Sequence, residues 1–241
     1  MRSHRCRPRV VKSTVRANGD GTQESPMIQP LIDFIDASPT SYHAVANAER
    51  MLRKNGFVPL CENERWRLEG GGIYYLTRNG SSLAAFRMPT RFPVQGFLTA
   101  VAHTDSPALK IKYHSVQMKE KAVEVSVEAY GGPILSTWLD RPLATAGVVV
   151  YEREPGCHER ALFRSDRPVA VVPNPAIHLN RDVNKGFEYK IQDHLNAVIC
   201  GEPTEKAETA GILDRYISEI IDCEPEKVKY ADLMLFEAQG G

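Results

Sequence analysis

Residues 97–107 read Phe97-Leu98-Thr99-Ala100-Val101-Ala102-His103-Thr104-Asp105-Ser106-Pro107, an apolar run that ends in a histidine and an aspartate. The continuous apolar part, residues 96–102, predicts a β-strand that is buried on both faces of a sheet. His103 and Asp105 are two residues apart at the C-terminal end of this strand, so we expect their side chains to point to the same side. A histidine in this position can hold a metal ion while the neighbouring carboxylate orients its ring. Pro107 is expected to end the strand, because proline cannot donate to a β-ladder.

The segment before this strand predicts two helices and a hairpin. Helical periodicity extends from Ile28 to Leu52 and is interrupted at residues 37–40, and Asn55-Gly56 is a typical helix end. Strand-like runs over residues 72–78 and 82–87 flank Asn79-Gly80, which is a strong signal for a hairpin turn. Together with the buried strand, these elements predict an α/β fold with its chemistry at the C-terminal end of a strand.

The segment after Lys110 has a different character and predicts several short antiparallel strands. Apolar residues alternate with polar ones over residues 123–129, and further apolar runs cover residues 146–151 and 169–172. Residues 213–221 have the apolar spacing of an amphipathic helix, and residues 230–237 predict one more strand. We therefore expect an α/β region that is followed by a β-rich region.

The composition excludes several classes of partner. The chain has 241 residues with 30 basic and 30 acidic side chains, so it lacks the one-sided charge of nucleic-acid or membrane-surface binding proteins. No apolar stretch approaches the roughly 20 residues that cross a bilayer. The five cysteines are scattered and odd in number, which fits a reducing compartment and predicts a cytoplasmic protein. Residues 1–25 predict a basic, disordered leader, with an organellar transit peptide within residues 1–19 as the alternative.

Five strings resemble, in order and in spacing, the signatures of the M18 family of zinc aminopeptidases, of the aspartyl aminopeptidase type. They are Phe34 to Val45 (FIDASPTSYHAV), Tyr75 to Ser81 (YLTRNGS), Ala102 to Pro107 (AHTDSP), Tyr130-Gly131-Gly132 with Ser136 to Arg141 (STWLDR), and Ala176-Ile177-His178-Leu179. The resemblance extends from about Ile28 to Phe236 and covers nearly the whole chain. The ordered set is far more specific than any one of these strings.

The resemblance implies a domain organisation. Residues 26–109 would form the first part of a catalytic α/β zinc-peptidase domain. Residues 110–228 would form an inserted, β-rich dimerisation or lid domain, and residues 229–241 would return to the catalytic domain. This division agrees with the change of character at Lys110.

The resemblance also implies an activity and roles for three residues. The activity is that of a metallo-aminopeptidase, in which water activated by two zinc ions removes N-terminal residues, acidic ones preferred, from a peptide substrate. His103 matches a zinc ligand, and Asp105 matches the carboxylate that orients this histidine without binding the metal. His178 matches a histidine that reaches from the inserted domain into the active site of a neighbouring subunit, which implies a homo-oligomer.

The remaining zinc ligands of the family lie in segments beyond those matched here. We therefore expect this chain to be an N-terminal portion of such an enzyme and to be inactive alone. The alternative is a non-catalytic oligomerisation or regulatory module derived from the family. The set of Trp138, Asp140 and Arg141 has two interpretations, a buried charge pair that holds the inserted domain together or a contact between subunits, and we favour the first.

Overall fold

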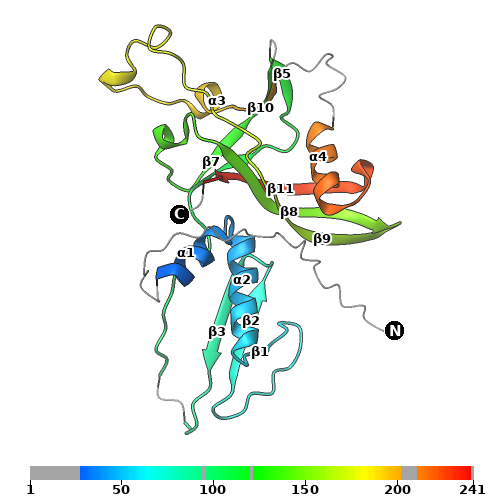
Figure 1. Cartoon of the computed structure of the whole chain (residues 1–241). Helices are drawn as coiled ribbons and strands as arrows, with labels where there is room; N and C mark the ends of the chain where they lie inside the picture. The colour runs from blue at the N-terminus through cyan, green and yellow to red at the C-terminus, as the bar shows by residue number, and fades with distance from the viewer. Residues whose placement is uncertain (1–27, 94–95, 120–121, 202–210, 240–241) are drawn as a thin grey trace. The chain divides into compact units, whose positions relative to one another are not determined.

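A computed structural model describes residues 28–93, 96–119, 122–201 and 211–239 of the chain. Within these residues the chain divides into two compact units, and the division falls between Ser106 and Pro107, close to the expected boundary at residues 109–110. Each unit has helices and sheets of its own (Figure 1). The expected leader over residues 1–25 lies outside the described residues.

The first unit contains two helices and a small sheet. Its elements are α1 (Ile28–Asp36), α2 (Ser41–Lys54), β1 (Val58–Pro59), β2 (Ile73–Arg78) and β3 (Ser82–Arg87). The strand order is β1-β2-β3, with β1 parallel and β3 antiparallel to β2. Helix α2 runs alongside β2 and β3 (Figure 1), and its Val45 is 2% exposed. The two predicted helices and the predicted hairpin are confirmed.

Local hydrogen bonds and backbone angles explain the breaks between these elements. The amide of Asn47 in α2 donates to the carbonyl of Ala37 at 2.8 Å and so holds the break between the helices. The buried His43 lies at the start of α2, with its Nδ1 2.8 Å from the hydroxyl of Thr40. The hairpin turn has positive φ angles at Asn79 and Gly80, the conformation that this residue pair favours.

The predicted buried strand over residues 96–102 is not formed. No residue of this segment belongs to a strand in the part of the chain that the structure describes. The side chains of Phe97, Leu98 and Val101 are 88%, 105% and 90% exposed. A strand buried on both faces requires hydrogen-bonding neighbours and two covering layers, and none of the described strands pairs with this segment. Pro107 does not end a strand either, since β4 (Ala108–Ile111) begins directly after it.

The second unit is built from two antiparallel sheets and a few short helices. Besides β4, its strands are β5 (Gln117–Lys119), β6 (Ala122–Val125), β7 (Val127–Tyr130), β8 (Leu143–Glu154), β9 (Cys157–Arg164), β10 (Ala197–Gly201) and β11 (Val228–Glu237). The helices are η1 (Leu135–Trp138), η2 (Val183–Lys185), α3 (Ile191–His194), α4 (Ile212–Ile221) and η4 (Pro225–Lys227). One sheet has the strand order β7-β4-β11-β8-β9 and the other the order β10-β6-β5. The β-rich character predicted after Lys110 is confirmed.

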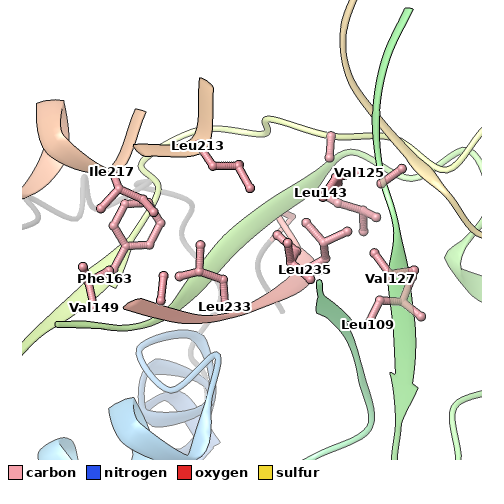
Figure 2. Close-up of a cluster of buried hydrophobic side chains, with 14 of the residues drawn as sticks. Leu109, Val125, Val127, Leu143, Val149, Phe163, Leu213, Ile217, Leu233 and Leu235 are labelled. Carbon is pink, nitrogen blue, oxygen red and sulfur yellow. The ribbon is translucent and has the colours of Figure 1, made fainter. Parts of the chain in front are cut away.

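Part of the core of this unit lies between α4 and the five-stranded sheet. Figure 2 shows Leu213 and Ile217 of α4 directed at Phe163 of β9 and Leu233 of β11. Of these side chains, Ile217 and Phe163 are 0% exposed, and Leu233 is 1% exposed. The helical spacing of residues 213–221 therefore buries one face of α4, as predicted.

A polar contact also anchors α4. The hydroxyl of Tyr113, just after β4, donates a hydrogen bond to the carboxylate of Asp214 near the start of α4. Burial, and then this hydrogen bond, raises the pKa of Tyr113 well above its usual range. The phenol is therefore a neutral donor at physiological pH.

Strand β11 differs from its predicted placement. We expected residues 229–241 to return to the first domain, but β11 pairs along its length with β8 and also with β4. Its alternate residues Ala231, Leu233 and Leu235 are buried in the core of the second unit, which explains this placement. The run at residues 169–172 also differs, because it forms only isolated bridges, to Leu139, to Leu143 and to β10.

Candidate metal site

His103 and Asp105 form a hydrogen-bonded pair in the first unit. The Nδ1 atom of His103 lies 2.9 Å from Oδ1 of Asp105. The histidine side chain is 90% exposed and the aspartate side chain is 34% exposed. Between them, the hydroxyl of Thr104 donates to the carbonyl of Ser81 at 2.8 Å, which ties this segment to the hairpin turn. The structure thus brings the two predicted residues together, although they do not lie at the end of a strand.

This geometry suits a metal-binding histidine. A carboxylate on Nδ1 favours the neutral tautomer with its proton on Nδ1, which leaves the lone pair of Nε2 available to a metal ion. Through this contact the carboxylate of Asp105 can fix the orientation of the ring without itself binding a metal ion. The predicted division of roles between the two residues fits this contact.

The described residues supply only part of a zinc site. Catalytic zinc is held by three protein ligands and a water, and structural zinc by four. Within residues 28–93, 96–119, 122–201 and 211–239, no group of three or more His, Cys, Asp or Glu side chains could hold a metal ion. His103 therefore fits as one ligand, and no reaction step through zinc can be derived from the described residues.

His178 lies in the second unit on an exposed turn that precedes η2. The turn is closed by the amide of Leu179, which donates to the carbonyl of Ala176 at 2.8 Å. Its apolar neighbours are exposed as well, Ile177 to 45% and Leu179 to 83%. This exposure is compatible with a residue that contacts another molecule.

Asp140 and Arg141 do not pair with each other. Arg141 donates to the carboxylate of Glu237 in β11 at 2.7 Å. Asp140 has a positive φ of 56°, and its carboxylate accepts a hydrogen bond of 2.9 Å from the amide of Asn174. Both residues thus hold separate segments of the second unit together. The structural role that we favoured fits these contacts, but the expected buried pair is wrong, because both residues are exposed and each has another partner.

The sequence reasoning did not anticipate an ion pair between strands β4 and β11. The ammonium of Lys110 in β4 lies 2.9 Å from the carboxylate of Asp232 in β11, and both side chains are more than half buried. The hydrogen bond from this ammonium to Asp232 raises the pKa of Lys110. The sequence contained only one indication of this pair, an aspartate within an apolar strand. The partner of that aspartate depends on the register between strands and could not be predicted.

Comparison with known proteins identifies the family. The sequence model of one protein family, described as aminopeptidase I zinc metalloprotease (M18), matches residues 34–241. This chain belongs to the M18 family. The resemblance carried by the motifs is thereby confirmed.

Curated M18 relatives are longer than this chain. The chain is 38% identical over 215 residues to a probable M18 family aminopeptidase 2 of Ectopseudomonas mendocina, a match that covers 88% of this chain and 50% of the relative. The chain spans about half the length of the curated relatives it matches. None of the helices that the structure describes is long and apolar enough to cross a membrane.

Solved M18 structures have a similar fold. A chain of the Ape4 and Nbr1 complex, determined by cryo-electron microscopy, superimposes with a TM-score of 0.82 at 33% identity, covering 88% of this chain and 44% of the other. The S. cerevisiae mApe1 dodecamer gives a TM-score of 0.70 at 26% identity, covering 89% of this chain and 49% of the other. These matches confirm the mixed α/β class of the M18 chain.

Proposed function

We propose that this M18 chain carries the first zinc-ligating segment of a metallo-aminopeptidase that removes N-terminal residues, acidic ones preferred, from peptides. The observation that carries the proposal is the contact between His103 and Asp105. A metal-facing histidine oriented by a carboxylate is a recurring arrangement in zinc enzymes. It lies here in a chain of an aminopeptidase family, at the position that the family's motif predicts.

In this proposal each residue has a limited task. His103 binds one ion of a zinc pair through Nε2, and Asp105 keeps the imidazole in the required tautomer and orientation. Bound zinc lowers the pKa of a water molecule and polarises the scissile carbonyl. His178 contacts the substrate in a neighbouring subunit of a homo-oligomer, and its position on an exposed turn supports this role.

The domain roles and the location in the cell are part of the same proposal. Residues 110–228 form an inserted dimerisation or lid domain, and the core of the second unit, which β4 and β11 complete, supports a domain of its own in this part of the chain. The protein acts in the cytoplasm, with an organellar location as the alternative if residues 1–19 are a transit peptide. Microscopy of the chain with and without residues 1–25, fused to a fluorescent protein, separates these two locations.

A second candidate function is a non-catalytic oligomerisation or regulatory module. It is favoured by the absence of a three-donor metal cluster among the described residues, while the second unit has a well-packed core of its own. In this case the chain would associate with copies of itself and would have neither bound zinc nor peptidase activity.

Zinc affinity separates the two functions. The full chain, which we expect to be inactive alone, is titrated with zinc, and binding is measured by isothermal titration calorimetry. For the first zinc-ligating segment we expect weak binding that is lost in His103→Ala and retained in His158→Ala, a matched exposed histidine in β9. Asp105→Ala should weaken zinc binding by about 10- to 100-fold. A chain that associates, and whose zinc affinity does not change in His103→Ala, would favour the module and refute the assigned ligand.

A further inference from the structure

We propose that Asp140 is a positioning residue that holds the exposed turn carrying His178. The inference rests on the proposed function for the role of His178, whereas the clamp itself rests on contacts between Asp140 and residues 172–174. The segment concerned is the long loop of residues 173–190, which precedes α3 and is drawn in yellow in Figure 1.

Backbone pairing fixes the start of this loop, which we call its neck (residues 171–172). The amide of Val171 donates to the carbonyl of Val198 at 3.0 Å, and the amide of Val198 donates back at 2.8 Å. Val172, the next residue, is 0% exposed and forms a bridge with Leu139. The neck is therefore fixed to the core, and the conformation beyond it depends on what holds the residues after Val172.

Asp140 holds the chain on both sides of Pro173. Its amide donates to the carbonyl of Val172 at 2.9 Å, and its carboxylate accepts from the amide of Asn174 at 2.9 Å. The left-handed backbone of Asp140, with φ at 56°, allows both contacts from one residue. Aspartate and asparagine adopt this conformation more readily than other residues with a side chain, apart from glycine.

The path from this clamp to His178 is short and stiff. Only Pro175, whose ring fixes φ, lies between Asn174 and the turn that begins at Ala176. The carbonyl of Ala176 accepts the amides of Leu179 at 2.8 Å and Asn180 at 3.2 Å, which closes the turn around His178. A fixed Asn174 therefore restricts where the imidazole can be presented.

The clamp is itself attached to the central sheet. Arg141, the next residue along the chain, donates to Glu237 of β11 at 2.7 Å, and the amide of Ala238 donates to the carbonyl of Pro142 at 3.0 Å. A continuous series of contacts thus leads from β11 through residues 140–142 to Asn174 and the turn. These contacts give Asp140 and Arg141 a role in positioning the turn, in addition to the packing of the unit.

Two substitutions at one position test the proposal. Asp140→Gly permits the left-handed backbone without steric cost and removes the carboxylate, whereas Asp140→Asn keeps both the backbone preference and an acceptor oxygen. Hydrogen exchange in the full chain provides the measurement. Because Pro173 and Pro175 have no amide hydrogen, the amide of Asn174 is the single exchanging site between Val172 and Ala176.

We expect Asp140→Gly to speed exchange at Asn174 and at the turn amides of Leu179 and Asn180 by about fivefold or more, since one hydrogen bond is lost. Asp140→Asn should restore most of the protection, and the amides of the core strand β8 should exchange as in the parent chain. Unchanged exchange at Asn174 would refute the clamp. Faster exchange at Asn174 with an unchanged turn would refute the positioning role.

Peptide binding to the full chain keeps this test separate from the proposed function, since it needs no turnover. If His178 contacts substrate, both His178→Ala and Asp140→Gly should weaken the binding of a peptide with an N-terminal aspartate, and Asp140→Asn should resemble the parent. A His178→Ala variant with the parental affinity would count against the proposed role of His178 and leave the exchange result on the clamp intact.

Discussion

Replacing Ile217 with alanine should be among the most destabilising single changes in the second unit. The side chain is 0% exposed and packs under α4 against Phe163 and the five-stranded sheet. The change removes three carbon atoms from the core, and at about 0.8 kcal/mol for each buried group the transfer cost is about 2.4 kcal/mol. The cavity left behind raises the expected loss to about 3–4 kcal/mol. Alanine returns only about 0.4 kcal/mol through its higher helix propensity.

The matched control is Ile220→Ala in the same helix, because it has the same gain in propensity at a half-buried position. Its expected loss is about 1 kcal/mol. Urea unfolding followed by tryptophan fluorescence measures both variants at one protein concentration. In a Trp66→Phe background, Trp138 alone reports, and it packs against the core of the second unit. Equal losses in the two variants would refute the packing of α4 with Ile217 facing the sheet.

Three further predictions concern the two units. Gly147→Ala should cost at least about 3 kcal/mol in thermal unfolding, since a Cβ atom there would lie 1.9 Å from the carbonyl oxygen of Asp232, whereas Gly132→Ala has open space and should be neutral. Lys110→Met should lower the free energy of unfolding at pH 7 by roughly 1–2 kcal/mol. Folding raises the pKa of Lys110, so the contribution of Lys110 to the free energy of unfolding is complete below the unfolded pKa of about 10.4 and is lost as the pH rises through the folded pKa. The stability difference between Lys110→Met and the parent, measured by urea titration, should therefore shrink above about pH 10.5. A difference that stays constant to about pH 11.5 would contradict the ion pair. Gly80→Ala should cost about 1 kcal/mol because φ is 64°, and unchanged melting of the first unit would contradict the turn.

The features that the sequence predicted correctly depend on near neighbours. The turn at Asn79-Gly80 follows from the backbone preferences of two adjacent residues, and the buried face of α4 follows from the spacing of apolar residues along one helix. The contact between His103 and Asp105 spans two residues and was also predicted. Such features need no knowledge of which strands lie side by side.

The features that were missed depend on strand pairing. The partner of Lys110 became evident only from the register that places β11 beside β4, and the partner of Arg141 lies 96 residues further along the chain. The prediction of a strand over residues 96–102 is wrong for the same reason. Its apolar residues indicate burial, but they do not determine which layers would cover them. A periodic pattern thus reports that a face is to be buried, and only the topology decides where.

Residues 96–105 combine two predicted features, a buried strand and an oriented histidine, and the structure contains only the second. The strand needs distant partners and is absent, whereas the hydrogen bond between His103 and Asp105 is local and persists at 2.9 Å. Thr104 adds a second local restraint through its hydrogen bond to Ser81. The orientation of the imidazole is therefore encoded within a few residues, while affinity for zinc requires two or three further donors from elsewhere. The imidazole of His103 is fixed in advance and therefore loses less conformational entropy when metal binds. Residues 103–105 thus contribute preorganisation, whereas most of the affinity for zinc has to come from the further donors.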